Sequence, residues 1–462
     1  MAEVVDAYSF DKGINTRKSS TILDDGELQE CSGFTLDNDG YLKPMKPRVK
    51  ITSDAYGEIK NLHRYMNTVL MCEGSNIRYA WDLRKYCDNY TAPDNNFTLA
   101  GTGYEARNRI VDYQGWMFLA NGHTNKAFCK GALYDWGVAN PTKECVGAAG
   151  AAGNPDGTYN LYYTYVVKFD NGMEYETGPS PPESVTVSSQ KITWSGIVPC
   201  PYGASGVEIR KRLYRYSSGL AETYYVTEIA NATTTYSDDA TDATIQTNDT
   251  LATTSFSVPP EGMTDIDLYI YRIFGVKGTY LYWSEPYIPF GFLTTSSINV
   301  TDGDDLVAVR FWGDQLYLAS KGKWYRLSGT DPDTWGIKNT FADMGVINPH
   351  TVHATKYGIL GLGYDGIYLF DGSISKNITE KKLGTSLFLD DISDTDACYA
   401  EWDGAKYYFY YPETTDVLSQ CLVIDFTFYP ELRIYNDPFI ATAHQFHKPT
   451  GRRYIARLDS TT

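Results

Sequence analysis

The chain has 462 residues, of which 42% are hydrophobic, 21% are charged and 15% are aromatic, with 39 tyrosines. This composition excludes a largely disordered chain, and the length predicts two or three domains. The formal net charge is −17. Tight phosphate binding needs clustered Lys and Arg, which the sequence lacks, so a module that grips DNA is excluded as well.

No segment is expected to direct the chain to a membrane or to anchor it there. The start at Met1 lacks a basic end followed by an apolar stretch, and no apolar run reaches the roughly 18 residues of a membrane span. The eight cysteines are scattered without a Cys-x-x-Cys pair. This pattern favours free thiols in a protein made in a reducing cytoplasm.

A short sequence motif, called the repeated phrase below, recurs along the chain with different residues. It consists of a turn that contains Gly, a strand of alternating aromatic and aliphatic residues, a polar turn and a second strand. Clear copies begin at Tyr113, Trp312, Tyr364 and Trp402, and weaker copies begin at Arg64, Phe274 and Thr450. Apart from one interruption, neighbouring copies lie roughly 35 to 50 residues apart, the interval of a four-stranded propeller blade. The repeat therefore predicts an all-β fold built on a β-propeller.

In chain order, residues 1–150 are predicted to form the N-terminal part of this β-propeller. The low-complexity stretch 147–153 reads as a flexible joint. Short strands are then predicted at 159–169, 184–188, 191–197, 207–216, 223–229 and 233–236. Their number and spacing make residues 151–256 an inserted immunoglobulin- or fibronectin-like β-sandwich. Residues 257–462 are predicted to form the C-terminal part of the propeller.

Two further expectations concern helices and closure. The best helical candidate is a weak pattern at 379–391. Closing a propeller requires that its first and last strands meet, because open sheet edges invite misassociation. Segments 41–51 and 453–458 could supply that closure.

Candidate chemical motifs are few, and each has a plainer interpretation. Gly361, Gly363 and Gly366 match the G-x-G-x-x-G dinucleotide pattern, but a strand is predicted after them where that motif needs a helix. His350 with His353, and His444 with His447, are three residues apart, so on a strand they point to opposite faces and cannot chelate a metal without a loop; loop or strand histidines without a metal are expected.

Acidic segments give no stronger signal. Residues 330–335 approach the sialidase Asp-box pattern, but Asp331 lies one residue too close to Trp335 and the Gly is absent. Residues 237–242 and 302–305 are acidic enough to hold Ca²⁺ but do not follow the EF-hand spacing, so solvated turns are expected there. Asp304 and Asp305, and likewise Asp390 and Asp391, fall at predicted turns, where Asp bonds the local backbone. We therefore expect no catalytic, cofactor-binding or metal-binding residues, and no cofactor.

Several segments, in the same order, resemble virion proteins of short-tailed bacteriophages, in the family of tail nozzle or packaged-DNA stabilisation proteins. They are residues 10–15 (FDKGIN), 28–43 (LQECSGFTLDNDGYLK), 212–215 (RLYR), 224–229 (YYVTEI), 235–238 (TYSD), 281–289 (LYWSEPYIP) and 322–329 (GKWYRLSG). The opening departs from the family pattern where Gly33 replaces an expected Asn. Residues 45–48 (MKPR) likewise replace an Arg-x-Gly ending.

The resemblance implies a structural protein of the phage tail, without enzymatic activity or membrane insertion, made in the host cytoplasm. It implies a homo-oligomeric ring, usually a hexamer, docked below the portal–adaptor assembly, with tail fibre or tip and plug proteins as further partners. This tail nozzle or tube would continue the DNA channel, retain packaged DNA and conduct it during ejection. Negative charge would let genomic DNA pass without specific binding.

Other classes of function stay open, because a fold does not fix a function. A receptor- or glycan-binding tail or baseplate component would need Trp312, Trp324 and Trp335 clustered on one rim. A glycosidase would need two carboxylates with separated pKa values that face one cleft. A propeller scaffold of host origin is the third alternative.

Overall fold

The computed structural model describes residues 13–14, 16, 27–28, 34–36, 42–44, 56–66, 68–81, 97–170, 172–202, 207–301, 303–447 and 452–456. Antiparallel strands dominate these residues, so the predicted all-β class is confirmed. The described helical segments are α2 (Asp242–Ile245), a 3-10 turn (Pro349–Thr351), α3 (Glu380–Leu383) and a π turn (Leu387–Asp391). The last two confirm the weak helical pattern at 379–391. Among the described helices, none is long and apolar enough to cross a bilayer.

Six sheets share one plan, in which four strands that follow one another in the chain also pair in that order. Two of them precede the insertion: β5 (Ile59–Tyr65), β6 (Thr68–Glu73), β7 (Asn76–Trp81) and β8 (Thr98–Thr102), and then β9 (Arg109–Tyr113), β10 (Trp116–Ala120), β11 (Asn125–Cys129) and β12 (Ala132–Asp135).

Four sheets of this plan follow the insertion. They are β22 (Asp265–Tyr269), β23 (Arg272–Lys277), β24 (Tyr280–Glu285) and β25 (Ile288–Asn299), with β21 (Phe256–Ser257) added beside β25; β26 (Leu306–Trp312), β27 (Gln315–Ser320), β28 (Trp324–Ser328) and β29 (Gly336–Asn339); β30 (His353–Thr355), β31 (Gly358–Leu362), β32 (Ile367–Phe370) and β33 (Ser375–Asn377); and β34 (Tyr399–Trp402), β35 (Lys406–Tyr411), β36 (Gln420–Asp425) and β37 (Arg433–Asn436).

The second strand of each sheet lies deep in the molecule, which explains the aromatic and aliphatic runs of the copies at Tyr113, Trp312 and Trp402. In β10, all five residues from Trp116 to Ala120 are at most 2% exposed. Neighbouring side chains of a strand point to opposite faces, so β10 is covered on both faces. The sharp turn into β10 uses positive φ angles at Gln114 (51°) and Gly115 (84°), which explains the Gly of the phrase.

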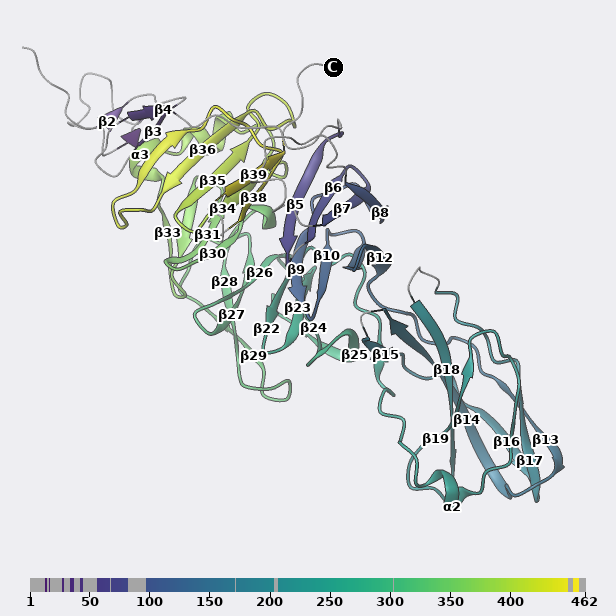
Figure 1. Cartoon of the computed structure of the whole chain (residues 1–462). Coiled ribbons are helices and arrows are strands. Elements are labelled where there is room, and N and C mark those ends of the chain that lie inside the picture. Colours follow the sequence, from purple (N-terminus) through teal and green to yellow (C-terminus); the bar gives the residue numbers. More distant parts are fainter. Residues whose placement is uncertain are drawn as a thin grey trace, which may run out of the picture.

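The first strands of successive sheets lie side by side around a common centre. Contacts join β9 to β22, β22 to β26, β26 to β30 and β30 to β34. The chain then reaches β38 (Ala443–His447), which pairs with β39 (Arg452–Ala456) and lies against both β34 and β5. Figure 1 shows these sheets as one elongated body, with β5 and β38 near each other.

The predicted closing segments pair elsewhere. In segment 41–51 the structure describes β4 (Leu42–Pro44), which pairs with β3 (Phe34–Leu36), and in segment 453–458 it describes part of β39, which pairs with β38. Residues 41, 45–51 and 457–458 lie outside the described residues. A further short pair, β1 (Gly13–Ile14) with β2 (Glu27–Leu28), places β1 against β37.

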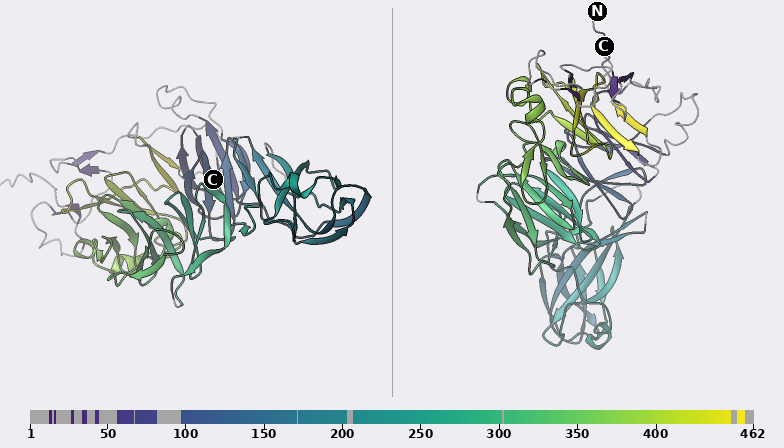
Figure 2. Two further views of the ribbon diagram at one scale, coloured as in Figure 1. Left: turned by 90° about the horizontal axis from the view of Figure 1, so that it is seen from below. Right: turned by 90° about the vertical axis from the view of Figure 1, so that its left-hand side faces the viewer.

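The insertion consists of two sheets that project from the rest of the molecule (Figures 1 and 2). One contains β13 (Val146–Ala152), β17 (Gln190–Ser195) and β20 (Tyr236–Asp238). The other contains β14 (Gly157–Phe169), β15 (Glu174–Glu176), β16 (Glu183–Val187), β18 (Val207–Ser217) and β19 (Tyr224–Ala230). These strands overlap all six segments predicted for this region. The two sheets share a core that includes Leu161, Trp194 and Leu213.

The prediction of a flexible joint at 147–153 is wrong, because most of this stretch belongs to strand β13 and pairs with β17. Its glycines have a packing role instead of a flexible one. A Cβ on Gly147 would lie 2.8 Å from Leu161 Cδ1 and 2.9 Å from Val185 Cβ, so only Gly lets β13 approach the facing sheet. The inserted sheets consequently begin at Val146, ahead of the predicted boundary.

One aromatic cluster joins the insertion to the sheets on either side of it. Phe169, at the end of β14, lies 4.7 Å from Trp116 of β10 and 5.1 Å from Phe290 of β25, measured between ring centroids. Trp136 Nε1 donates to the carbonyl of Pro289 at 2.8 Å. All these side chains belong to a single hydrophobic core. The insertion is therefore fixed to the body through packed rings.

Candidate functional site

Charged side chains from distant parts of the chain meet where the first strands converge. We call Arg107, Arg109, Asp265, Arg310, His350 and His353 the central cluster. At its heart lies Asp265, which is 0% exposed. Its Oδ1 accepts from Arg109 Nε and from its neighbour's backbone N–H, both at 3.0 Å, and its Oδ2 accepts from Arg310 Nη1 and from the Val309 N–H at 2.8 Å. Both oxygens are thus fully used, and three first strands (β9, β22 and β26) are tied together.

The two other arginines extend these ties around the centre. Arg310, 4% exposed on its side chain, donates from Nε to the Val352 carbonyl and from Nη2 to the Pro349 carbonyl, both at 3.2 Å. Arg107 donates to the carbonyls of Lys60 in β5 and Thr442 beside β38, and its guanidinium lies 4.1 Å from the centre of the Tyr399 ring. These bonds connect elements from both ends of the chain.

Two histidines complete the central cluster. His353 Nε2 lies 2.9 Å from the Ala400 carbonyl, which joins β30 to β34. Burial, together with the nearby Arg109 and Arg310, lowers the pKa of His353 to about 3, although the bond to Ala400 opposes this. Burial and the charges of Arg107, Arg109 and Arg310 likewise hold the pKa of His350 well below its usual range. Both imidazoles are therefore neutral near pH 7.

The sequence pattern gave an incomplete account of these histidines. His350 lies in the 3-10 turn and not on a strand, so the argument from strand alternation does not apply to it. His444 is fully buried, with Nδ1 3.2 Å from the Tyr410 hydroxyl, and the side chain of His447 lies outside the described residues. Within the described part of the chain, no three His, Cys, Asp or Glu side chains are placed to hold a metal ion.

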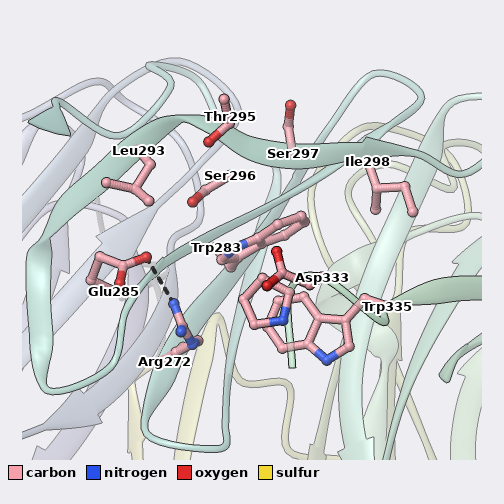
Figure 3. Close-up of a pocket in the computed structure, with 11 residues that line it drawn as sticks. Arg272, Trp283, Glu285, Leu293, Thr295, Ser296, Ser297, Ile298, Asp333 and Trp335 are labelled. Carbon is pink, nitrogen blue, oxygen red and sulfur yellow. Dashed lines mark hydrogen bonds and ion pairs between the residues drawn. The ribbon is translucent and has the colours of Figure 1, made fainter. Parts of the chain in front are cut away.

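A pocket of about 420 Å³ opens between the sheet β22–β25 and the loop before β29 (Figure 3). It exists because β25 carries extra residues: Tyr282 pairs with Ser297 but Ser284 pairs with Phe292, so residues 293–296 oppose Trp283 alone. Such bulges often occur beside functional sites. The lining residues are Arg272, Trp283, Glu285, Leu293, Thr295, Ser296, Ser297, Ile298, Pro332, Asp333 and Trp335.

Ion pairing and ring packing occupy much of this pocket's wall. Arg272 Nη1 contacts Glu285 Oε1 at 3.0 Å (Figure 3), and its guanidinium lies 5.7 Å from the centre of the Trp335 ring. Trp283 and Trp335 meet edge to face at 4.9 Å and are only 5% and 9% exposed. Little indole surface is left for a ligand to stack on.

The segment that approached the Asp-box pattern forms part of this wall. Asp331 Oδ1 accepts from the backbone N–H of Thr334 at 3.1 Å and from its hydroxyl at 3.0 Å. This compact turn between β28 and β29 directs Trp335 into the core, against Trp283 and Phe274. Asp331 therefore has a structural role in the turn.

The aromatic rim required by the glycan-binding alternative is not assembled. Trp324 is 1% exposed and stacks on Phe370 at 4.5 Å. Trp312 donates from Nε1 to the Thr355 carbonyl at 2.6 Å and packs beside a different core cluster from that of Trp335. The three rings are thus used in packing between sheets, which sequence spacing does not reveal.

The glycine motif and the pair Asp304 and Asp305 lie where their plainer interpretations placed them. Gly363 and Gly366 form the turn between β31 and β32, so a strand follows the G-x-G-x-x-G segment as predicted. Asp304 and Asp305 precede β26, and Asp390 and Asp391 end the π turn; Asp302 lies outside the described residues. The interpretation of segment 237–242 as a solvated turn is wrong for Asp238, which is 0% exposed in β20 and, with Asp242, binds the buried Arg215.

Comparisons with known proteins assign neither family nor function. No family model matches the chain, and no curated protein matches it. Similar solved structures include apo AztD from Citrobacter koseri, with 12% identity, a TM-score of 0.34, and coverage of 80% of this chain and 83% of that one. Another is Hsv2 from Kluyveromyces lactis, with 7% identity, a TM-score of 0.27, and coverage of 86% and 96%. Scores this low carry no argument about this chain.

Proposed function

We propose that this chain is a structural subunit of a bacteriophage tail, and that copies of it form a nozzle ring that continues the DNA channel below the portal and adaptor. In this proposal the six four-stranded sheets and the β38–β39 pair form a β-propeller, which the convergence of their first strands supports. The two inserted sheets form a β-sandwich within it. The assignment to the virion rests on the resemblance of the ordered segments to tail nozzle proteins.

The observation that carries the proposal is the packing of the insertion against the body. Phe169, Trp116 and Phe290 pack the inserted sheets onto the body, so one chain presents two distinct surfaces in a fixed relation. A closed ring needs that property, because each head-to-tail contact joins two different surfaces of the subunit at one constant angle. A loosely tethered insertion would not define such an angle.

The proposal also says where DNA would pass. The centre of the first strands is filled by Asp265, Arg310 and their partners, which are nearly inaccessible, so no duplex can thread a single subunit. The channel would lie between copies, and a net charge of −17 would keep phosphates from adhering to its wall. The chain would then act without catalysis.

The test is electron microscopy with mass determination on the chain mixed with the portal–adaptor assembly of its phage. A closed ring that extends the channel, usually of six copies, is the expected result. The portal without its adaptor is the control and should recruit no ring. A chain that stays free, or that hangs singly from the tail periphery, would overturn the proposal and favour the receptor- or glycan-binding alternative, for which the pocket of Figure 3 would be the first site to test.

A further inference from the structure

Arg109 has more hydrogen-bond donors than the protein around it accepts. Its Nε donates to Asp265 Oδ1 at 3.0 Å, and no described residue accepts from its two terminal nitrogens. Asp265 has no capacity left, because each of its oxygens already accepts two hydrogen bonds. The Arg109 side chain is 21% exposed. Among the described residues, some side-chain nitrogen and oxygen atoms are buried without a hydrogen-bond partner, and the terminal nitrogens of Arg109 are not among these. They therefore face accessible space.

His350 is a second group without a partner at the same place. Its ring forms no hydrogen bond with any described residue, and its side chain is only partly buried. It follows Pro349, whose carbonyl accepts from Arg310 Nη2 at 3.2 Å, and Arg310 shares Asp265 with Arg109. A structural imidazole would normally bond a neighbour, as His353 does with the Ala400 carbonyl. The His350 imidazole is thus partly exposed, free of protein hydrogen bonds and close to guanidinium groups, which is a suitable place for an anion.

We propose that Arg109 and His350 bind a small free oxyanion, a phosphate or a carboxylate, with His353 at the edge of the site. The terminal nitrogens of an arginine form a planar fork that matches two oxygens of such an anion. An imidazole N–H can donate to a further oxygen. Asp265 and Arg310 are 0% and 4% exposed on their side chains and Arg109 is 21% exposed, so this recessed site suits a small free anion better than the backbone of a nucleic acid. The inference does not depend on the proposed tail function.

Binding should be coupled to the protonation of His350. The groups that face this ring are Arg107, Arg109 and Arg310, and their charges, after burial, keep it neutral. A bound anion offsets that repulsion and favours the imidazolium, which gains a second N–H donor. Proton uptake on binding requires that affinity rises as pH falls. Two other titratable groups lie nearby. His353 has a pKa of about 3 and therefore stays neutral in this pH range. The pKa of Asp267 is raised by burial, and the charge of Arg310 opposes that rise.

The experiment uses the full chain and measures calorimetric titration and thermal unfolding with inorganic phosphate or acetate, against chloride at equal ionic strength. Saturable binding of at least one anion is expected, stronger about one pH unit below neutral, with a shift of the His350 ring resonances. Comparison of the affinities for phosphate and for acetate shows which of the two anion classes the site prefers. In His350→Gln the affinity should fall about tenfold or more, since hydrogen bonds to charged groups contribute enough for that factor. Arg109→Gln should lose binding as well.

Arg326→Gln is the matched control, because it removes one arginine from β28, outside the central cluster, and should leave binding unchanged. Arg109 also holds the buried Asp265, so Arg109→Gln could fail to fold. His350→Gln keeps the test decisive, since its ring has no described protein partner to lose. The proposal is overturned if neither anion stabilises the wild-type chain beyond the chloride control, or if His350→Gln retains the wild-type affinity and pH dependence.

Discussion

Phe169 of the insertion and Phe290 of the body stack with their ring centroids 5.1 Å apart and their planes 28° from parallel. The two residues are 121 positions apart in the sequence, yet both contact Trp116 of a third element, at 4.7 and 5.0 Å. Phe290 is 0% exposed and Phe169 is 5% exposed. This contact makes the insertion and the body one mechanical unit, so it should matter for stability and for shape together.

Phe290→Ala should therefore destabilise the chain by about 3–5 kcal/mol, the usual cost of removing a buried phenylalanine ring. Denaturant unfolding gives the free energy, and small-angle X-ray scattering should show a wider range of insertion orientations. Phe341→Ala removes a ring that is 86% exposed and should change stability by no more than about 0.5 kcal/mol. Equal effects of the two substitutions would contradict the structural role of the stack.

Strand β13 offers a second test, since the sequence favoured a flexible joint there. Gly147→Val should destabilise by about 1–3 kcal/mol, because its side chain would overlap Leu161 and Val185. Ala151→Val, on an exposed position of the same strand, should have little effect. Hydrogen exchange by mass spectrometry should find the amides of β13 that pair with β17 protected. Rapid exchange throughout 146–152 would restore the flexible interpretation.

Local pattern predicted the strands well because turns and alternation are local properties. It placed the repeated phrase less well. The copies at Tyr113, Trp312 and Trp402 mark the turn between the first and second strands of a sheet. Those at Phe274 and Tyr364 belong to turns between the second and third strands. Tight hairpin turns use the same Gly and Asp residues at both ends of a sheet. One copy of the motif therefore cannot show which hairpin of its sheet it marks.

The central cluster could not be predicted from the sequence at all. Arg109, Asp265, Arg310 and His350 follow no common spacing, because each comes from a different sheet or turn and only the convergence of first strands brings them together. The stretch 147–153 failed for a related reason. Gly and Ala are typical of linkers, but Gly147 is required by the approach of Leu161 and Val185, and that approach is a tertiary contact.

The buried ion pair of the insertion gives a third prediction. Arg215, 0% exposed on its side chain, contacts Asp238, 1% exposed, and its Nη2 contacts Asp242 Oδ1 at 3.0 Å. Arg215→Met should destabilise by about 3–5 kcal/mol, because it leaves Asp238 buried without its cation. Arg215→Met combined with Asp238→Leu should recover part of that loss.

A nearby exposed pair serves as the control for this prediction. Lys191 Nζ and Asp239 Oδ2 lie 3.2 Å apart with side chains 37% and 40% exposed. Lys191→Met should cost no more than about 1 kcal/mol, since solvent screens the pair. If both single substitutions cost the same in denaturant unfolding, burial of Arg215 is not what makes its pair important.

The low pKa of His353 predicts acid sensitivity with a definite sign. In the folded chain its pKa is about 3, lowered from an ordinary 6.5. Between these values the unfolded chain binds a proton that the folded chain does not, so acid favours unfolding. The difference in unfolding free energy between wild type and His353→Asn should fall by about 1.4 kcal/mol per pH unit below pH ~6.5. A difference that stays constant from neutral pH to pH ~5 would show that His353 is protonated in the folded state.

Lys211 gives the corresponding prediction on the alkaline side. Its side chain is buried, and Nζ donates to the carbonyls of Thr233 at 2.6 Å and Ile197 at 3.2 Å. Burial lowers its pKa from 10.5 to about 8, against a small opposing effect of Cys200. Between pH 8 and 10.5 the unfolded chain holds a proton that the folded chain has released, so the contribution of Lys211 to stability rises with pH.

Lys211→Met isolates this contribution from that of the tyrosines, which titrate in the same range. The stability of wild type relative to Lys211→Met should rise by about 1.4 kcal/mol per unit above pH ~8. Lys168→Met, which removes an amine that is 34% exposed and paired with Glu228, should show no such rise. A flat difference for Lys211→Met would mean that the two carbonyls hold a fully charged ammonium in the core of the insertion. The desolvation cost of Lys211 would then be met by hydrogen bonding rather than by loss of its proton.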